Sequence, residues 1–292
     1  MHTVISRDSS DEPTLPMTLD DADDETTFWR GLRVFEAAGI THPGQVRKNN
    51  EDAYRLTPEL GFCAVADGLG GHAGGEVASS LAVGNVHRFL EDVATRRAKL
   101  LCSGHEGQIV MSPAFELSSL GDLLVAAVQY ANRLINETAA ENEHLDGMAT
   151  TFAGLLVNQG RAAVVHAGDS RVYRIRGGKV ERLTTDHSLR ELYLKVYKDA
   201  ARPEIADRNA TIVTRTVGGR PRVQPDVTTF AVEPDDVFLL CTDGLWNLVS
   251  DDEMGFALAG TPTLEATLAK LLATAYNRGG HDNITAVLVR CR

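Results

Sequence analysis

Short apolar segments rich in residues that favour β-strands recur along the chain, separated by polar and glycine-containing stretches. Such segments are typical of buried β-strands. We therefore expect strands at Val34–Thr41, Gly61–Ala66, Thr151–Val157, Ala162–His166, Arg171–Ile175, Val227–Val232, Val237–Thr242 and Ile284–Arg290.

Apolar residues recur at helical spacing in three longer segments, which are Glu76–Leu90, Leu120–Thr138 and Leu264–Tyr276. Thr263, directly in front of the third segment, is a favourable N-cap because its hydroxyl can accept a bond from a free backbone N–H. Residues 96–119 contain many Gly, Ser and other small residues and predict a loop. Many strands and a few helices, without regular βαβ alternation, indicate an α+β fold.

The chain has 292 residues and a net charge of −11, which is unevenly distributed. Residues 1–30 carry eight acidic and two basic residues, which gives this segment a net charge of −6. Because residues 1–28 are also polar and lack periodicity, we expect a disordered acidic tail, followed by one globular domain at residues 29–292. The tail is either a solvating leader without a function or a regulatory segment.

The composition also argues against several classes of protein. No apolar segment approaches the roughly 20 residues that cross a bilayer, and residues 1–10 lack the apolar core of a secretory signal. No stripe of basic and aromatic residues indicates nucleic-acid binding. No CxxC spacing occurs among Cys63, Cys102, Cys241 and Cys291, and two of these fall in expected core strands. We expect reduced thiols and a cytoplasmic monomer that binds neither membranes nor nucleic acid.

Acidic residues stand at the ends of three expected core strands. Two apolar runs end on Asp67-Gly68 and Asp243-Gly244, and Asp282 precedes a third run. Carboxylates held on stiff elements, without a cluster of Cys or His, favour Mg²⁺ or Mn²⁺ over Zn²⁺. The alternative, solvated acids in turns, explains any one of these positions but accounts poorly for all three.

A short segment near the N-terminal side combines both kinds of charge. Arg47 lies four residues before Glu51, which Asp52 follows directly. A guanidinium can bind two phosphate oxygens, while carboxylates hold a cation. Together with the strand-end acids, this combination indicates a metal-assisted phosphate hydrolase.

The glycine-rich segment after Asp67 also fits a loose dinucleotide-binding pattern through Gly68, Gly70 and Ala73. That interpretation fails because Asp67 would repel a pyrophosphate, and because the later strands do not alternate with helices. A P-loop is excluded since no Gly-Lys-Ser/Thr follows.

Eight short motifs in a fixed order, spanning residues from about 36 to 290, resemble those of the PPM family of metal-dependent Ser/Thr protein phosphatases (protein phosphatase 2C-like). Each motif is weak by itself, but the ordered set is specific. The motifs are Val46-Arg47 to Asp52-Ala53, Val65–His72, Ala149–Thr151, Gly168–Arg171, Thr185–Ser188, Thr216–Gly218, Thr242–Trp246 and Gly280–Thr285.

The resemblance implies a central β-sandwich of two antiparallel sheets flanked by pairs of helices, and hydrolysis by a two-metal-activated water without a phosphoenzyme. Asp67 would bridge two Mn²⁺ or Mg²⁺ ions, Arg47 would bind the phosphate, and Asp169 matches an acid at a weaker third metal site. The catalytic residues would be Arg47, Asp67 and Asp243. The metal-binding residues would be Glu51, Asp52, Asp67, Gly68, Asp169, Asp243 and Asp282.

Two positions depart from the family pattern. Leu69 stands where eukaryotic members carry a general-acid histidine, a departure that bacterial members share. His72 could replace that acid, or it is a locally bonded residue at a helix start, in which case metal-bound water protonates the leaving oxygen. Asn247 stands where the family commonly has Asp.

Residues 189–210 correspond to the family's variable flap beside the site. Its apolar residues either pack on the body or belong to a flap that brings Arg202 and Arg208 near the phosphopeptide. The resemblance implies phosphorylated proteins as partners, namely a Ser/Thr kinase or its substrates. The rival function is a catalytically silent phosphoprotein-binding module; loss of a metal-binding Asp would mark it, and none is lost.

Overall fold

The computed structural model describes residues 35–69, 73–94, 119–198 and 212–291. The expected acidic tail and nearly all of the expected loop at 96–119 lie outside the described residues. His72, Arg202 and Arg208 also lie outside them.

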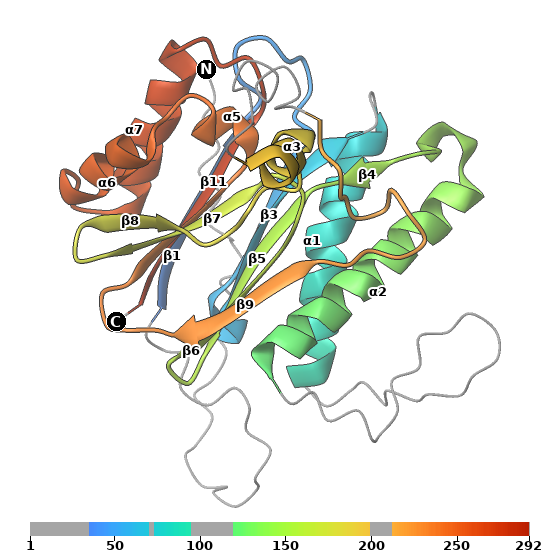
Figure 1. Cartoon of the computed structure of the whole chain (residues 1–292), viewed down its shortest axis with the longest axis horizontal. Coiled ribbons are helices and arrows are strands. Elements are labelled where there is room, and N and C mark those ends of the chain that lie inside the picture. Colours follow the sequence, from blue (N-terminus) through green and yellow to red (C-terminus); the bar gives the residue numbers. More distant parts are fainter. Residues whose placement is uncertain (1–34, 70–72, 95–118, 199–211, 292) are drawn as a thin grey trace, which may run out of the picture.

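Two antiparallel sheets form the centre of the molecule (Figure 1). One sheet has the strand order β1-β11-β10-β7-β8, the other β2-β3-β5-β6-β9, and the short β4 pairs with β3. The strands are β1 Phe35–His42, β2 Asp52–Thr57, β3 Phe62–Leu69, β4 Ala149–Thr150, β5 Phe152–Asn158, β6 Arg161–Ala167, β7 Arg171–Arg176, β8 Lys179–Arg182, β9 Asp226–Ala231, β10 Val237–Cys241 and β11 Ile284–Cys291.

Helices cover the outer faces of both sheets, α1 and α2 on one side and α6 and α7 on the other (Figure 1). The helices are α1 Ala73–Ala94, α2 Leu120–Glu141, α3 Leu189–Tyr197, α5 Asp243–Trp246, α6 Asp251–Ala259 and α7 Leu264–Asn277, with 3₁₀ turns at Pro58–Leu60 and Glu143–Leu145. The expected α+β sandwich is confirmed.

The two-residue period of the strands builds the layers. In β3, Phe62, Ala64 and Ala66 pack with α1 and α2, whereas Cys63 and Val65 pack between the sheets. Each large side chain that is fully buried in this way contributes about 1.5–3 kcal/mol. Both faces of the central strands are therefore apolar, and polar side chains are left for the strand ends.

Side-chain caps fix where several helices begin. The predicted N-cap is confirmed, because the Thr263 hydroxyl accepts a 3.2 Å bond from the Ala266 N–H. The Ser119 hydroxyl caps α2 in the same way. At α6, Ser250 and Glu253 form a reciprocal capping box.

All eight expected strands and all three expected helices are present, with ends that differ by a few residues except at α1. The elements that were not expected are β2, β4, β8, α3, α5 and α6. β2 and β8 are partly polar and lie at sheet edges, and α6 buries only Met254 and Ala257. Their apolar pattern is therefore weak.

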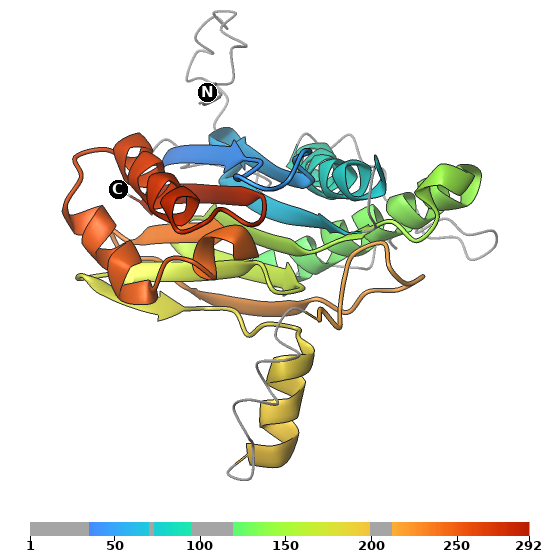
Figure 2. The same ribbon diagram turned by 90° about the horizontal axis from the view of Figure 1, so that it is seen from above.

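Helix α3 projects from the sandwich (Figure 2). None of its residues is buried, and Leu192, Val196 and Tyr197 are more than half exposed. The alternative in which the apolar residues of this segment pack on the body is wrong for α3.

The three cysteines that the structure describes, Cys63, Cys241 and Cys291, are free and buried, as expected for reduced thiols. Among the described helices, none combines the length and the apolar character that a membrane span requires.

Candidate metal centre

Antiparallel pairing brings the predicted acids to one end of the sandwich. Asp52 at the start of β2 is the register partner of Asp67 near the end of β3. In the other sheet, Cys241 pairs with both Arg171 and Ala286. The chain just beyond these positions carries three more acids at the same end of the sandwich, namely Asp169, Asp243 and Asp282.

Asp52 is a buried carboxylate with no counter-ion among the described residues. Its Oδ2 accepts a 2.8 Å bond from the Thr242 hydroxyl, while its buried Oδ1 has no hydrogen-bond partner. Burial raises the pKa of Asp52 to about 7, despite bonds from Thr242 and Thr285 that favour the charged form. Removing a charged carboxylate from water is costly unless a cation replaces the lost solvation.

Asp67 is fixed through its backbone. Its N–H donates to the Thr151 hydroxyl at 2.9 Å, and its carbonyl oxygen accepts from the Thr150 hydroxyl at 2.8 Å. Burial raises the pKa of the Asp67 carboxyl well above its ordinary value, and the charges of Asp52, Asp243, Asp169 and Asp282 raise it further. The structure therefore brings these five predicted acids together.

Asp243 and Asp169 continue the cluster. Burial raises the pKa of Asp243 to about 6, with Asp282 as the next cause, and raises that of Asp169 to about 7, with Asp243 as the next cause. The buried Oδ1 of Asp243 has no hydrogen-bond partner, and its Oδ2 accepts a 3.3 Å bond from Asn247. The departure at Asn247 thus contacts a predicted metal-binding acid directly.

Glycine is required where the Asp67 strand meets α1. A Cβ on Gly68 would lie 2.2 Å from the Gly75 carbonyl oxygen, and a Cβ on Gly75 would lie 2.2 Å from Glu51 Oε2. The Gly68 N–H also donates to the Glu51 carbonyl oxygen at 3.1 Å. This close approach places the Glu51 carboxylate beside Gly75, which packs directly against Gly68.

Arg47 stands at the open side of the cluster. Its guanidinium donates to Asp282 Oδ2 at 2.8 Å, and the two side chains are 56% and 36% exposed. The bond to Asp282 raises the pKa of Arg47, and the charges of Glu51 and Asp67 add to this effect. A permanent positive charge therefore lies next to the carboxylates and in reach of solvent.

Asn283 holds the Arg47 segment against this edge, a role that was not predicted. Its amide nitrogen donates to the Pro43 and Asn49 carbonyl oxygens, and its Oδ1 accepts from the Glu51 N–H at 2.8 Å. The only sequence signal was its place beside Asp282. Thr242 and Thr151 were also missed as partners of the acids.

These observations fit a divalent cation. The donors are all oxygens, two buried carboxylate oxygens lack a partner, and burial raises the pKa of several acids, as expected for a cluster whose charge is uncompensated. Hard cations such as Mg²⁺ and Mn²⁺ prefer this donor set.

A separate group of possible metal ligands comprises His166, His187 and Asp226, whose ligand atoms lie within 4.8 Å of one another. The two imidazoles are stacked at 4.5 Å with an interplanar angle of 5°, and His166 Nε2 donates to the Thr185 carbonyl oxygen. Asp226 is already paired with Arg215. None of these residues belongs to the predicted acidic cluster.

Without metal, the acids of this cluster should lower the free energy of unfolding as pH rises from about 4 to 7. The pKa values of Asp52, Asp169 and Asp243, about 7, 7 and 6, all lie above the ordinary 3.8, so the folded state binds more protons than the unfolded state in this window. The loss of stability is absent below the pKa that these carboxyl groups have in the unfolded chain. It is complete above their pKa values in the folded protein.

Urea unfolding at several pH values, with EDTA or with saturating Mn²⁺, measures this effect. We expect the Mn²⁺-dependent gain in stability to grow with pH, because metal replaces the protons. The buried His187, whose pKa is lowered to about 4, contributes an opposite pH dependence, but it does so with and without Mn²⁺. A Mn²⁺-dependent gain that stays constant or falls from pH 5 to 8 would therefore contradict the expected uncompensated cluster.

Comparison with known proteins agrees with this geometry. The model of the family described as protein phosphatase 2C matches residues 43–288. The chain is 30% identical over 252 residues to the serine/threonine phosphatase stp of Listeria monocytogenes, covering 85% of this chain and 93% of that protein. It is 30% identical over 257 residues to the protein phosphatase PhpP of Streptococcus pneumoniae, covering 87% and 96%.

Solved structures give the same result. The serine/threonine phosphatase PstP/Ppp of Mycobacterium tuberculosis superposes with a TM-score of 0.73 at 31% identity, covering 89% of this chain and 99% of that one. The catalytic domain of PstP in complex with two manganese ions gives a TM-score of 0.71 at 32% identity, covering 88% and 98%. The chain belongs to the protein phosphatase 2C family.

Proposed function

We propose that this protein hydrolyses phosphoserine and phosphothreonine side chains of proteins, using divalent cations held by the acidic cluster at the sheet edge. The observation that carries the proposal is the group of buried carboxylates with unpartnered oxygens beside the half-exposed Arg47. The named activity of the stp relatives and the two manganese ions of the PstP structure support it.

The residues divide by their position around the cluster. Asp67 and the Gly68 carbonyl would hold one cation, and Asp67, Asp243 and Asp282 the other. Two Mn²⁺ or Mg²⁺ ions bound there would activate a water for attack on phosphorus and balance the negative charge of the phosphoryl group. Glu51 would act at the rim, whereas Asp52, expected there too, is buried and would add a carboxylate within the cluster. Asp169 would hold a third, weaker cation.

The described cysteines are poorly suited to act as the nucleophile, which supports direct attack by water. Burial raises the pKa values of Cys63, Cys241 and Cys291, so the thiols that the structure describes remain protonated and inaccessible. A cysteinyl-phosphate intermediate on these residues is therefore disfavoured. Arg47, half exposed beside Asp282, is placed to bind and orient the incoming phosphate.

The rival function, a silent phosphoprotein-binding module, would not require an intact acidic cluster. Every predicted acid is present, and Asp52, Asp67, Asp169, Asp243 and Asp282 converge. Uncompensated buried carboxylates lower the stability of the folded state. A module that only binds phosphoproteins would gain nothing from them, so the intact cluster favours catalysis.

The proposed physiological substrates are phosphoproteins in the cytoplasm, either a Ser/Thr kinase or the proteins that it phosphorylates. Phosphate release from matched phosphoserine, phosphothreonine and phosphotyrosine peptides, each with Mn²⁺ and then with EDTA, tests the activity. Metal-dependent release from the first two supports the proposal. Tight binding of a phosphopeptide without release would favour the rival function.

Arg47→Ala should raise KM for a phosphopeptide about tenfold or more. A charged hydrogen bond contributes about 1.5–3 kcal/mol, and the guanidinium would contact phosphate before and during reaction, so that its loss mainly weakens binding. Steady-state kinetics with Lys48→Ala, an exposed cation next in sequence, provides the matched control. If KM is the same in Arg47→Ala and Lys48→Ala, Arg47 does not bind the phosphate.

A further inference from the structure

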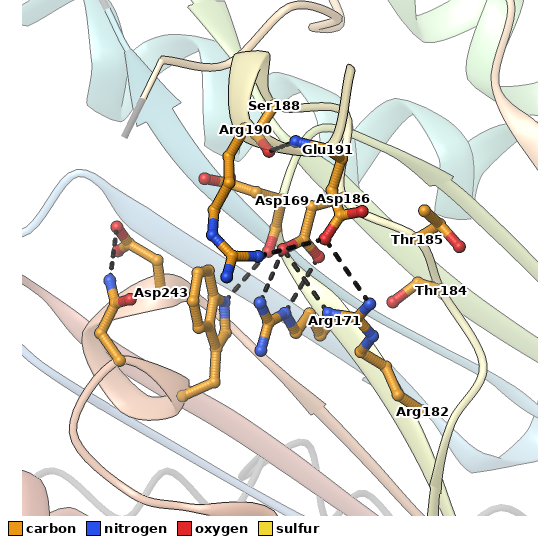
Figure 3. A network of polar contacts seen from close by, with 12 residues as sticks. Asp169, Arg171, Arg182, Thr184, Thr185, Asp186, Ser188, Arg190, Glu191 and Asp243 are labelled. Atoms are coloured by element: carbon orange, nitrogen blue, oxygen red, sulfur yellow. Dashed lines mark hydrogen bonds and ion pairs between the residues drawn. The ribbon is translucent and has the colours of Figure 1, made fainter. Parts of the chain in front are cut away.

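An indole joins the two segments that carry Asp169 and Asp243, both labelled in Figure 3. Trp246 is the last residue of α5, the helix that begins with Asp243. Its Nε1–H donates a 3.0 Å bond to the backbone carbonyl oxygen of Asp169, in the loop between β6 and β7. The position of Asp169 relative to Asp243 therefore depends on the orientation of this ring.

Arg171 fixes that orientation. Its guanidinium carbon lies 3.4 Å from the centre of the Trp246 ring, which is the distance of close stacking. Its Nε and Nη2 donate to the two oxygens of Asp186 at 2.9 and 2.6 Å, and its Nη1 donates to the Tyr173 hydroxyl at 3.2 Å. Every nitrogen of the guanidinium is engaged, so its plane cannot rotate freely.

The pair is shielded from water, since the side chains of Arg171 and Asp186 are 14% and 6% exposed. The same segment also holds the Asp169 loop, because the N–H of His187 donates to the Gly168 carbonyl oxygen at 2.9 Å. A buried, bidentate ion pair of this kind is geometrically specific. The arrangement restrains the Asp169 loop from the indole side and the β7 side.

Arg171 also balances a buried charge in this segment. It is the bidentate partner of Asp186, whose other ion pair, with Arg182, is longer at 3.7 Å. Loss of the Arg171 guanidinium would therefore weaken the anchoring of Asp186 as well as remove the stacking on Trp246.

We propose that Arg171 is a positioning residue which, by stacking on Trp246, fixes Asp169 relative to Asp243 and thereby sets the affinity for a divalent cation at Asp169. The inference rests on the proposed function, because it assigns a cation to Asp169. Arg171 itself contacts neither the cation nor the substrate; it acts through the indole and the Asp169 carbonyl.

Calorimetric titration with Mn²⁺ tests this positioning role without relying on activity. Arg171→Lys keeps the charge but loses the planar fork and the stacking, and Trp246→Phe keeps a ring but loses the N–H donor. We expect each change to weaken the lowest-affinity Mn²⁺ step by about 5- to 20-fold and to raise the half-activating Mn²⁺ concentration in proportion.

Arg174→Lys is the matched control. Arg174 lies on the same strand, pairs with Glu181 at 2.6 Å and faces the Phe230 ring at 5.5 Å. It should leave Mn²⁺ binding within about twofold of wild type. Unchanged Mn²⁺ binding in both Arg171→Lys and Trp246→Phe would overturn the proposal. If Arg171→Lys does not fold, Trp246→Phe still decides the outcome.

A double-mutant cycle with Asp169→Asn shows whether Arg171 acts through Asp169. In the Asp169→Asn background, Arg171→Lys should have no further effect on Mn²⁺ binding. A full additional loss would show that Arg171 acts on another part of the centre and would overturn the inference. Absence of Mn²⁺ binding in the wild-type protein is a different result, since it would refute the proposed function itself.

Discussion

Asp243→Asn should lower kcat by at least about 10³-fold. The substitution keeps the size of the side chain but removes a negative ligand from the proposed cation pair, and metal activation of water is the largest contribution expected in such a site. Asp243 follows the buried strand β10, and its Oδ1 has no protein partner to lose. The loss should therefore be chemical and leave the fold intact.

The matched control for this prediction is Asp251→Asn, an exposed acid in the first turn of α6. Its turnover should stay within about twofold of wild type, and circular dichroism of both variants should match the parent. Hydrolysis of p-nitrophenyl phosphate by Asp243→Asn within a few-fold of wild type would show that Asp243 does not hold a catalytic cation.

The acids could be predicted from the sequence because strand ends are visible in it. A run such as Val237–Thr242 is apolar enough to be buried, so an acid directly after it must lie where the strand ends. Antiparallel pairing then brings such ends together, as the register of Asp52 and Asp67 shows. The ordered motifs supplied the sheet arrangement, which the strand pattern alone did not determine.

The supporting contacts could not be predicted in this way. Thr242 bonds to Asp52 across a separation of 190 residues, and Asn283 bonds to Asn49 across 234 residues. Nothing local in the sequence distinguishes these residues from other polar residues in turns. The same holds for Trp246, whose bond to Asp169 exists only after two loops from different parts of the chain meet.

Helix α3 was missed although its sequence carries a signal. Its apolar residues Leu189, Leu192, Tyr193, Val196 and Tyr197 recur at helical spacing, but none of them is buried. The Ser188 hydroxyl caps the helix by accepting from the Glu191 N–H. Spacing and cap together indicate a helix, whereas the family resemblance assigned the segment only to a variable flap.

Removal of divalent metal should abolish hydrolysis, with a loss of at least about 10³-fold that Mn²⁺ reverses. Without a cation, the buried carboxylates repel one another and no water is activated. Burial raises the pKa values of Asp52 and Asp169 to about 7, so that proton uptake near neutral pH offsets part of this repulsion.

The measurement is phosphate release after dialysis against EDTA, followed by titration with Mn²⁺, Mg²⁺ or Zn²⁺. Because the donors are all oxygens, Mn²⁺ and Mg²⁺ should restore more activity than Zn²⁺. Asp243→Asn should respond weakly to the same titration, since its defect lies in the centre that the metal completes. Full activity in EDTA, with the metal content of the sample shown to be negligible, would refute a metal-dependent mechanism.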